Sequence, residues 1–294
     1  GVSPIAWSND DMPELGVETT LEECLSEAKI AGFSGIEFGG KFPLESEILI
    51  PKLKKENLKL CSGWYGAHLL KNKPTEEYQL MKQQLRLFQD CQATCMVVAE
   101  VTNSIQGDPM KPLSKRPILD NDAWKTLVYR INELSSMMID SGMPLAYHHH
   151  MGTVIQTQKE IERLIENTKD SVKLLIDTGH MLFTGGDSIK LINDFYQKII
   201  HVHTKDIRKD VLLNSLREDL SFRQAFLNGT FTVPGDGCID FSPIITALKD
   251  KHYSGWIVIE AEQDPIKANP LEYAKKGYNY LSKVIKDTGL KILD

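Results

Sequence analysis

Four stretches in the second half of the sequence end in side chains that can bind a metal ion or carry a proton. They read AYHHHMG, LLIDTGH, HVHTKD and VIEAE, and apolar residues typical of a buried strand lie in or just before each of them. Because side chains alternate along a strand, residues two positions apart share one face. The residues expected on one face, or within reach of it, are His148 and His150; Asp177 and His180; His201, His203 and Lys205; and Glu260 and Glu262.

One residue from each stretch would complete a metal site. His148, Asp177, His203 and Glu260 together supply two imidazoles and two carboxylates. This mixture of nitrogen and oxygen donors suits a borderline divalent ion such as Mn, Co, Zn or Fe, and it disfavours Ca or a thiolate zinc site. If all four ligands come from one rim of strand ends, one side of the ion stays open to substrate. We therefore expect a catalytic ion.

The remaining residues of these stretches are candidates for proton transfer: Lys205, His150, Glu262 and His180. We expect burial and the neighbouring ion to lower the pKa of Lys205. The lysine could then act as a base, or stay charged and stabilise an enolate. Simpler interpretations stand beside these, since Asp177 could cap a following helix and Lys205 could be a solvated loop residue. The sequence does not assign the acid and the base.

The elements that would position these residues follow an alternating pattern of short apolar runs and longer helical periods, which is typical of repeated βα units. Strands are expected at 2–7, 35–38, 58–64, 95–100, 144–150, 172–177, 199–204 and 255–262. Among the helices between them, the clearest are expected at 20–32, 75–91 and 121–142, the first with an N-cap at Thr19 or Thr20 and a stop at Gly32.

Eight parallel strands with long crossovers close most simply into an α/β fold of the (β/α)8 TIM barrel type, here a single domain over residues 1–294. An open doubly wound sheet is disfavoured, because no G-x-G-x-x-G follows the first strand and polar residues end nearly every strand. Two long connections, 101–120 and 205–241, would lie over the catalytic face.

Composition narrows the classes of function. The chain has 294 residues and a formal net charge of −6, whereas a general nucleic-acid binder needs a basic face. No apolar run approaches the roughly 20 residues that span a bilayer, so we expect no membrane partner. The opening residues do not read as a secretion signal, and the five cysteines form no C-x-x-C pair, so we expect reduced thiols and a cytoplasmic location.

These motifs together resemble one family, the xylose isomerase-like barrels, and within it the inosose (2-keto-myo-inositol) dehydratases of myo-inositol catabolism. The likeness covers nearly the whole chain and rests on PIAWSNDDMPELG, GFSGIEFGGKFP, AEVTNSIQGD with PLSKRP, AYHHHMGT, IDTGHMLFTGGD, HVHTKDIR, FTVPGDG and GWIVIEAEQDP. The superfamily usually holds its metal with Glu, Asp, His and Glu. This sequence matches at Asp177, His203 and Glu260, but it has His148 at the first position, as the Tyr-His-x-His form of the dehydratase branch implies.

The resemblance implies a metal-dependent lyase that removes water from 2-keto-myo-inositol to give a trihydroxycyclohexane-1,2-dione. It implies a divalent ion, Mn or Co before Zn or Fe, and no redox cofactor. A small polyhydroxylated cyclic ketone needs several hydrogen-bonding groups, and the candidates for binding it are Asn9, Asp10, Glu37, Gln106, Arg116 and Asp236. A homo-oligomer is compatible with the sequence, which marks no particular face for a partner.

Four alternatives remain open on the sequence alone. A sugar or inosose isomerase or epimerase of the same barrel would share the metal but return the proton. A metal-dependent endonuclease relative would need more ligands and a surface that grips DNA. A non-haem iron oxygenase would use two histidines and one carboxylate, and Glu260 would then occupy a position that oxygen needs. A polyol-binding protein with a structural metal would show no turnover.

Overall fold

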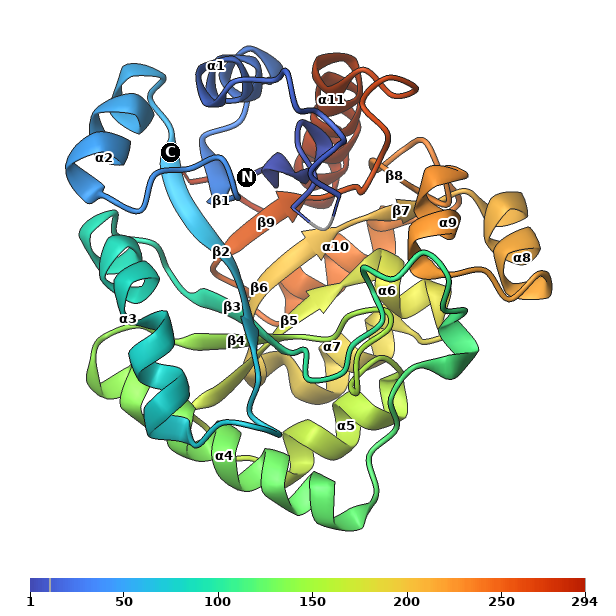
Figure 1. The fold of residues 1–294 in the computed structure, drawn as a ribbon. Coiled ribbons are helices and arrows are strands. Elements are labelled where there is room, and N and C mark those ends of the chain that lie inside the picture. Colours follow the sequence, from blue (N-terminus) through green and yellow to red (C-terminus); the bar gives the residue numbers. More distant parts are fainter. Residues whose placement is uncertain (11, 294) are drawn as a thin grey trace.

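A computed structural model describes residues 1–10 and 12–293, so Asp11 and the last residue of the expected domain lie outside the described residues. Seven parallel strands form one sheet in the order β1-β2-β3-β4-β5-β6-β9, with the helices around it (Figure 1). The strands are β1 (Gly35–Phe38), β2 (Lys59–Ala67), β3 (Met96–Glu100), β4 (Leu145–His148), β5 (Val172–Asp177), β6 (Ile199–Thr204) and β9 (Trp256–Ile259). The predicted TIM barrel fold is confirmed.

The segment 2–7, where we expected a strand, differs most from the prediction. Val2 alone makes the bridges, to Ile36 in β1 and to Ile259 in β9, and so connects the two edges of the sheet. A 3-10 helix, η1 (Pro4–Ala6), follows at once. The physical reason is Pro4, which has no N–H to donate and cannot continue a ladder between two strands.

Eleven α-helices are present in the described part of the chain. They are α1 (Leu21–Ala31), α2 (Ser46–Lys55), α3 (Pro74–Asp90), α4 (Asn121–Asp140), α5 (Gln158–Asn167), α6 (Thr178–Phe183), α7 (Ser188–Phe195), α8 (Lys209–Arg217), α9 (Phe222–Leu227), α10 (Phe241–Asp250) and α11 (Pro270–Thr288). The three helices predicted at 20–32, 75–91 and 121–142 are confirmed as α1, α3 and α4. Thr20 caps α1 by accepting from the backbone N–H of Glu23, and Gly32 ends it at φ 108°.

A second, smaller hydrophobic cluster lies apart from the main core and includes Phe183, Phe222, Phe226 and Phe231. It joins α6 and α9 to a two-stranded antiparallel sheet of β7 (Asp206–Ile207) and β8 (Phe231–Thr232). Between β6 and β9 the chain therefore inserts a packed unit. Two further 3-10 helices are η2 (Leu113–Lys115) and η3 (Tyr196–Lys198). None of the helices in the described ranges combines the length and apolar character needed to cross a membrane.

Candidate active site

The four side chains predicted as metal ligands come together at the carboxyl ends of the strands. His148 ends β4, Asp177 ends β5, His203 is the second-last residue of β6 and Glu260 follows β9 directly. One donor atom from each lies within 4.8 Å of the others, and all four residues are buried. Asp177 Oδ2 is 3.7 Å from both His148 Nε2 and His203 Nδ1. Glu260 Oε2 is 2.8 Å from His203 Nδ1.

These donor atoms have the properties that a divalent ion requires. Both ring nitrogens of His148 and Oδ2 of Asp177 are buried without a hydrogen bond, which is costly for polar atoms that have left water. Burial lowers the pKa of His148 to about 4, so its imidazole is neutral, as a metal ligand must be. Two nitrogens and two carboxylate oxygens therefore fit a borderline divalent ion.

Glu37, at the end of β1, binds His203 from the opposite side. Its Oε1 accepts hydrogen bonds from His203 Nε2 (3.0 Å), from His201 Nε2 (2.9 Å) and from the hydroxyl of Ser62. Burial lowers the pKa of His203, but the carboxylates of Glu260 and Glu37 outweigh burial and raise it well above the usual range. With Nε2 donating to Glu37, Nδ1 of His203 is held toward the other ligands, as in metal sites where a carboxylate orients a ligating histidine.

Lys205 is completely buried among carboxylates. Its Nζ donates to Glu262 Oε1 at 2.7 Å and lies 3.0 Å from His180 Nε2. It also lies 2.9 Å from Glu260 Oε2 and 3.3 Å from Asp177 Oδ2. Burial alone would lower the pKa of Lys205, but Asp177, Glu260 and Glu262 outweigh burial and raise it. This direction is opposite to the lowered pKa that we expected, because three carboxylates, Asp177 at the end of β5 and Glu260 and Glu262 after β9, surround the ammonium.

His150 and Glu262 lie just beyond β4 and β9, where we expected them inside strands. Both line a cavity at the mouth, whereas Lys205 and His180 are not among its lining residues. His150 Nδ1 lies 2.9 Å from the carbonyl oxygen of Met151, to which it donates when it carries the ring proton, so that Nε2 keeps its lone pair. Burial, together with the neighbouring imidazoles, lowers the pKa of His150 well below the usual range. A neutral imidazole and a carboxylate thus face the cavity.

Comparison with known proteins places this site in a family. The xylose isomerase-like TIM barrel model matches residues 25–284. Inosose dehydratase of Geobacillus thermodenitrificans is 46% identical over 284 residues, which cover 96% of this chain and 95% of that protein. The rhizopine catabolism protein MocC of Rhizobium meliloti is 42% identical over 291 residues, 99% of this chain and 90% of that protein.

The chain belongs to the inosose dehydratase family of xylose isomerase-like barrels. It is accordingly an enzyme, a dehydratase that breaks a carbon–oxygen bond. The structure of the zinc-binding protein IOLI shares the fold, with 16% identity and a TM-score of 0.68 over 98% of this chain and 96% of that chain.

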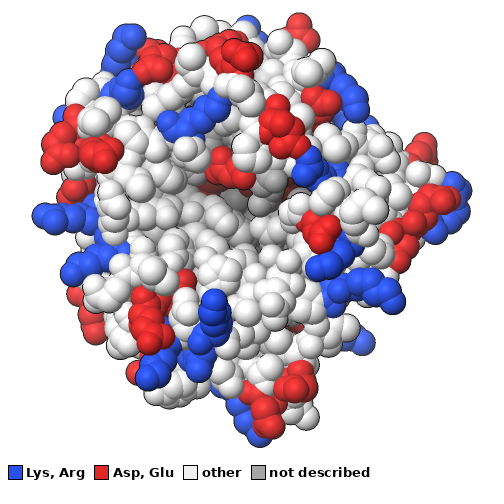
Figure 2. All heavy atoms as spheres, viewed as in Figure 1, with Lys and Arg blue, Asp and Glu red and all other residues white. Residues whose placement is uncertain are grey.

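Four of the predicted substrate contacts of this dehydratase lie at or beside the cavity. Asp10, Glu37 and Gln106 line it. Asn9 is buried next to them, with its side-chain oxygen accepting from the N–H of Met12 at 3.0 Å. The face seen in Figure 2 is hollowed near its centre, and acidic side chains lie at the edge of the hollow.

The other two predicted contacts have partners elsewhere. Arg116 pairs with Glu160 Oε1 at 2.6 Å. Asp236 pairs with Arg208 at 2.6 Å and also binds Lys276. Neither Arg116 nor Asp236 is among the residues that line the cavity, and their role as substrate contacts stays a prediction.

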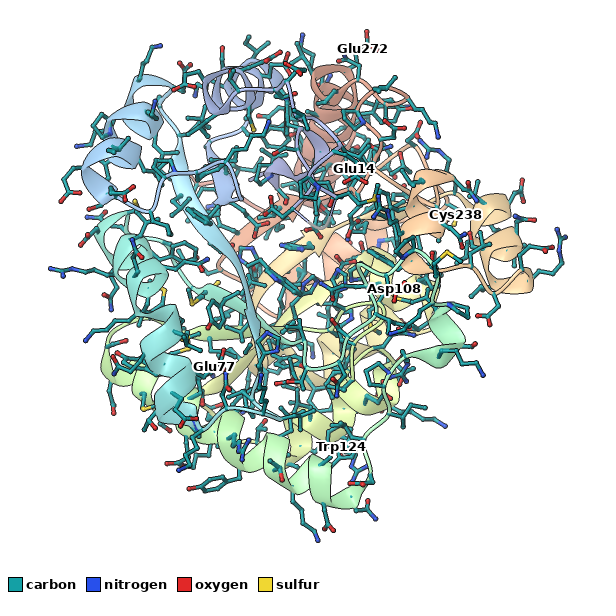
Figure 3. All side chains as sticks on the ribbon, in the orientation of Figure 1. Glu14, Glu77, Asp108, Trp124, Cys238 and Glu272 are labelled. Atoms are coloured by element: carbon teal, nitrogen blue, oxygen red, sulfur yellow. The ribbon has the colours of Figure 1, made fainter. Side chains whose placement is uncertain are left out.

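Aromatic side chains complete the surroundings of the dehydratase site. Trp64 lines the cavity and packs edge-on against His148 and His150, with ring centroids 5.4 and 5.3 Å apart. Tyr65, the next residue, instead donates to Glu77 Oε1 at 2.8 Å, and Figure 3 shows Glu77 on α3, at the outside of the barrel. Neighbouring side chains of a strand point to opposite faces, which is why Trp64 and Tyr65 of β2 have different surroundings.

Both long connections lie beside the site, as expected. In the segment 205–241, the ring of Phe222 packs against His150 at 5.1 Å between centroids. The segment 101–120, marked by Asp108 in Figure 3, contacts this insertion where the N–H of Leu113 donates to the carbonyl of Leu220.

Sequence reasoning missed one contact of the site. His149 Nε2 accepts from the N–H of Asp177 at 3.2 Å and so connects the end of β4 to the end of β5 beside the metal ligands.

Proposed function

We propose that this dehydratase removes water from 2-keto-myo-inositol to give a trihydroxycyclohexane-1,2-dione, with one divalent ion held by His148, Asp177, His203 and Glu260. The observation that carries the proposal is the convergence of these four donors within 4.8 Å, next to a cavity lined by His150 and Glu262. Relatives named inosose dehydratase, 43–46% identical over nearly the whole chain, support the substrate. The zinc atom of the IOLI structure supports the ion.

The donor set also bears on which ion binds. Two imidazoles and two carboxylates form a borderline set, for which we propose Mn²⁺ or Co²⁺ before Zn²⁺ or Fe²⁺. The five cysteines are all free thiols, which supports the cytoplasmic location that we propose.

When bound, the ion supplies a Lewis acid for the negative charge that develops on the ketone oxygen. The chain's own residues move the protons. Water loss requires that a base take the proton from the carbon beside the ketone and that an acid protonate the hydroxyl on the next carbon as its C–O bond breaks. His150 and Glu262 both line the cavity and both start as bases, the imidazole because Nδ1 holds the ring proton and the carboxylate because its pKa is low. The group that takes the α-proton thereby becomes the acid that gives this proton to the departing hydroxyl, so that the proton leaves with the water.

Lys205 and His180 do not line the cavity, but both lie against Glu262. The hydrogen bond from Lys205 and its charge hold the carboxylate in place and keep the pKa of Glu262 low, although burial alone would raise it. After water has left, the enol that remains at the former α-carbon converts to the second carbonyl. Asn9, Asp10, Glu37 and Gln106 are the nearest candidates for binding the ring hydroxyls.

The test is incubation of the metal-reconstituted protein with 2-keto-myo-inositol. We expect an ultraviolet-absorbing enolised dione, formed only with metal present. An isomerase or epimerase would instead yield a saturated polyol ketone, which a mass spectrum distinguishes because no water is lost. Absence of any product with Mn²⁺, Co²⁺, Zn²⁺ and Fe²⁺ would favour a binding protein and overturn the proposal.

A further inference from the structure

A second group of donor atoms lies directly beside the first. It consists of His150, His180 and Glu262, whose donor atoms also lie within 4.8 Å of one another. Glu262 Oε1 is 3.9 Å from His150 Nε2 and 3.7 Å from His180 Nε2. All three residues are buried. Two imidazoles and a carboxylate are a common metal-binding set, so this group could hold a cation of its own.

A cation that belongs to the chain already lies among these donors. The Lys205 ammonium donates to Glu262 Oε1 at 2.7 Å and is 3.0 Å from His180 Nε2. The lysine side chain is 0% exposed, so solvent does not compete for these partners. Its Nζ also lies 5.1 Å from the centre of the Phe231 ring, close enough for a cation–π contact. The position between His180 and Glu262 is therefore filled.

Two carboxylates connect the two groups. Asp177 Oδ2 and Glu260 Oε2 lie 3.3 and 2.9 Å from Lys205 Nζ. The same two oxygens lie 3.7 and 2.8 Å from His203 Nδ1 on the other side. Neighbouring cation positions that share carboxylates are the arrangement of a two-metal site. Here one position has metal ligands and the other holds an ammonium.

The charges allow either one ion with the ammonium or two ions without it. Asp177, Glu260 and Glu262 surround Lys205, and Glu37 accepts from His203, so four carboxylates lie among these groups. One divalent ion and the ammonium bring three positive charges, and two divalent ions without the ammonium bring four. Two divalent ions together with the ammonium would bring five, one more than the carboxylates balance, which is strongly unfavourable in a buried space.

We propose that the Lys205 ammonium is the built-in occupant of a second cation site formed by His150, His180 and Glu262, and that it limits the enzyme to one divalent ion per chain. Removal of the ammonium opens this site to a second ion. The inference rests on the metal site of the proposed function but involves no substrate. Loss of inosose turnover therefore does not affect it.

Metal content of two matched variants tests the inference. Lys205→Ala removes the charge and leaves room for an ion, whereas Lys205→Met removes the charge and fills the space. After equilibrium dialysis against Mn²⁺, we expect one ion per chain in the wild type, two in Lys205→Ala and one in Lys205→Met, measured by mass spectrometry of the metal. A double variant, Lys205→Ala with His180→Ala, should return to one ion.

Electron paramagnetic resonance gives an independent readout. Shared carboxylates should couple the two Mn²⁺ ions of Lys205→Ala, whereas the wild type should show an isolated ion. One uncoupled ion in folded Lys205→Ala overturns the inference while leaving the first metal site intact. No ion in the wild type overturns both. If Lys205→Ala folds only when Mn²⁺ is supplied, two ions per chain support the inference, and one ion, or failure to fold with metal, overturns it.

Discussion

Glu37 offers a quantitative test of how this barrel holds its metal ligands. Glu37→Gln keeps the shape of the side chain and an oxygen that can accept from His203, but it removes the negative charge. In the structure one oxygen of Glu37 accepts from the Nε2 atoms of both His203 and His201. The substitution therefore turns two hydrogen bonds to a charged acceptor into two weaker, neutral ones.

The expected loss follows from those bonds. A hydrogen bond to a charged group contributes about 1.5–3 kcal/mol, against about 1 kcal/mol for a neutral one. Of the two imidazoles only His203 belongs to the group of four metal ligands, so the difference of about 0.5–2 kcal/mol for one hydrogen bond falls on metal binding. This corresponds to a roughly 2- to 30-fold weaker affinity, which overlaps the lower part of the range of about 10- to 100-fold that is typical when the hydrogen-bond partner of a ligating histidine is changed.

The assay is competition for Mn²⁺ or Co²⁺ with a fluorescent chelator. The matched control is Glu100→Gln, because Glu100 is also a buried glutamate at a strand end but accepts from the backbone of Leu69 and Thr102. We expect the control to keep the wild-type metal Kd, and Glu37→Gln to regain most of its kcat at saturating metal. A Kd of Glu37→Gln within twofold of wild type, or an equal loss in both variants, would refute the reasoning.

Three further predictions concern the same site. Glu260→Ala should lose both bound metal and dehydratase activity while circular dichroism stays native, and full activity would contradict the ligand set. Chelation should abolish turnover and lower Tm, since an ion at a hundred times its Kd adds about 2.7 kcal/mol of stability; an unchanged Tm would argue against a tightly held ion. Gly179→Ala should lower kcat at least tenfold, because its Cβ would lie 2.6 Å from Lys205 Cγ, whereas Gly107→Ala, with no atom within 4 Å, should not.

Local sequence patterns were sufficient to predict which strand ends carry the proposed metal ligands. His148, Asp177 and His203 each lie at or near the end of an apolar run, and parallel strands end on one rim, so their convergence could be predicted. Alternation also separated His149 from its two neighbours. The first strand was mispredicted because residues 2–7 look like an apolar strand. Pro4 ends the pairing, and Val2 alone bridges the sheet.

Loop residues were harder to place. Arg116 and Asp236 have the side chains expected of substrate contacts, yet they pair with Glu160 and with Arg208. Their partners are 44 and 28 positions away in the sequence. No periodic pattern encodes such a pairing, because a connection outside the sheet takes its path from the elements it packs against.

The amino-acid sequence by itself determined the barrel, the direction of its strands and which strand ends carry the proposed metal ligands, because these follow from the two-residue alternation of strands and from helix signals. Only the tertiary structure decided the state of Lys205 and the partner of Glu37. Both depend on distances of about 3 Å between charged atoms on different strands, and electrostatic energy at such distances changes steeply with geometry that the order of residues does not contain.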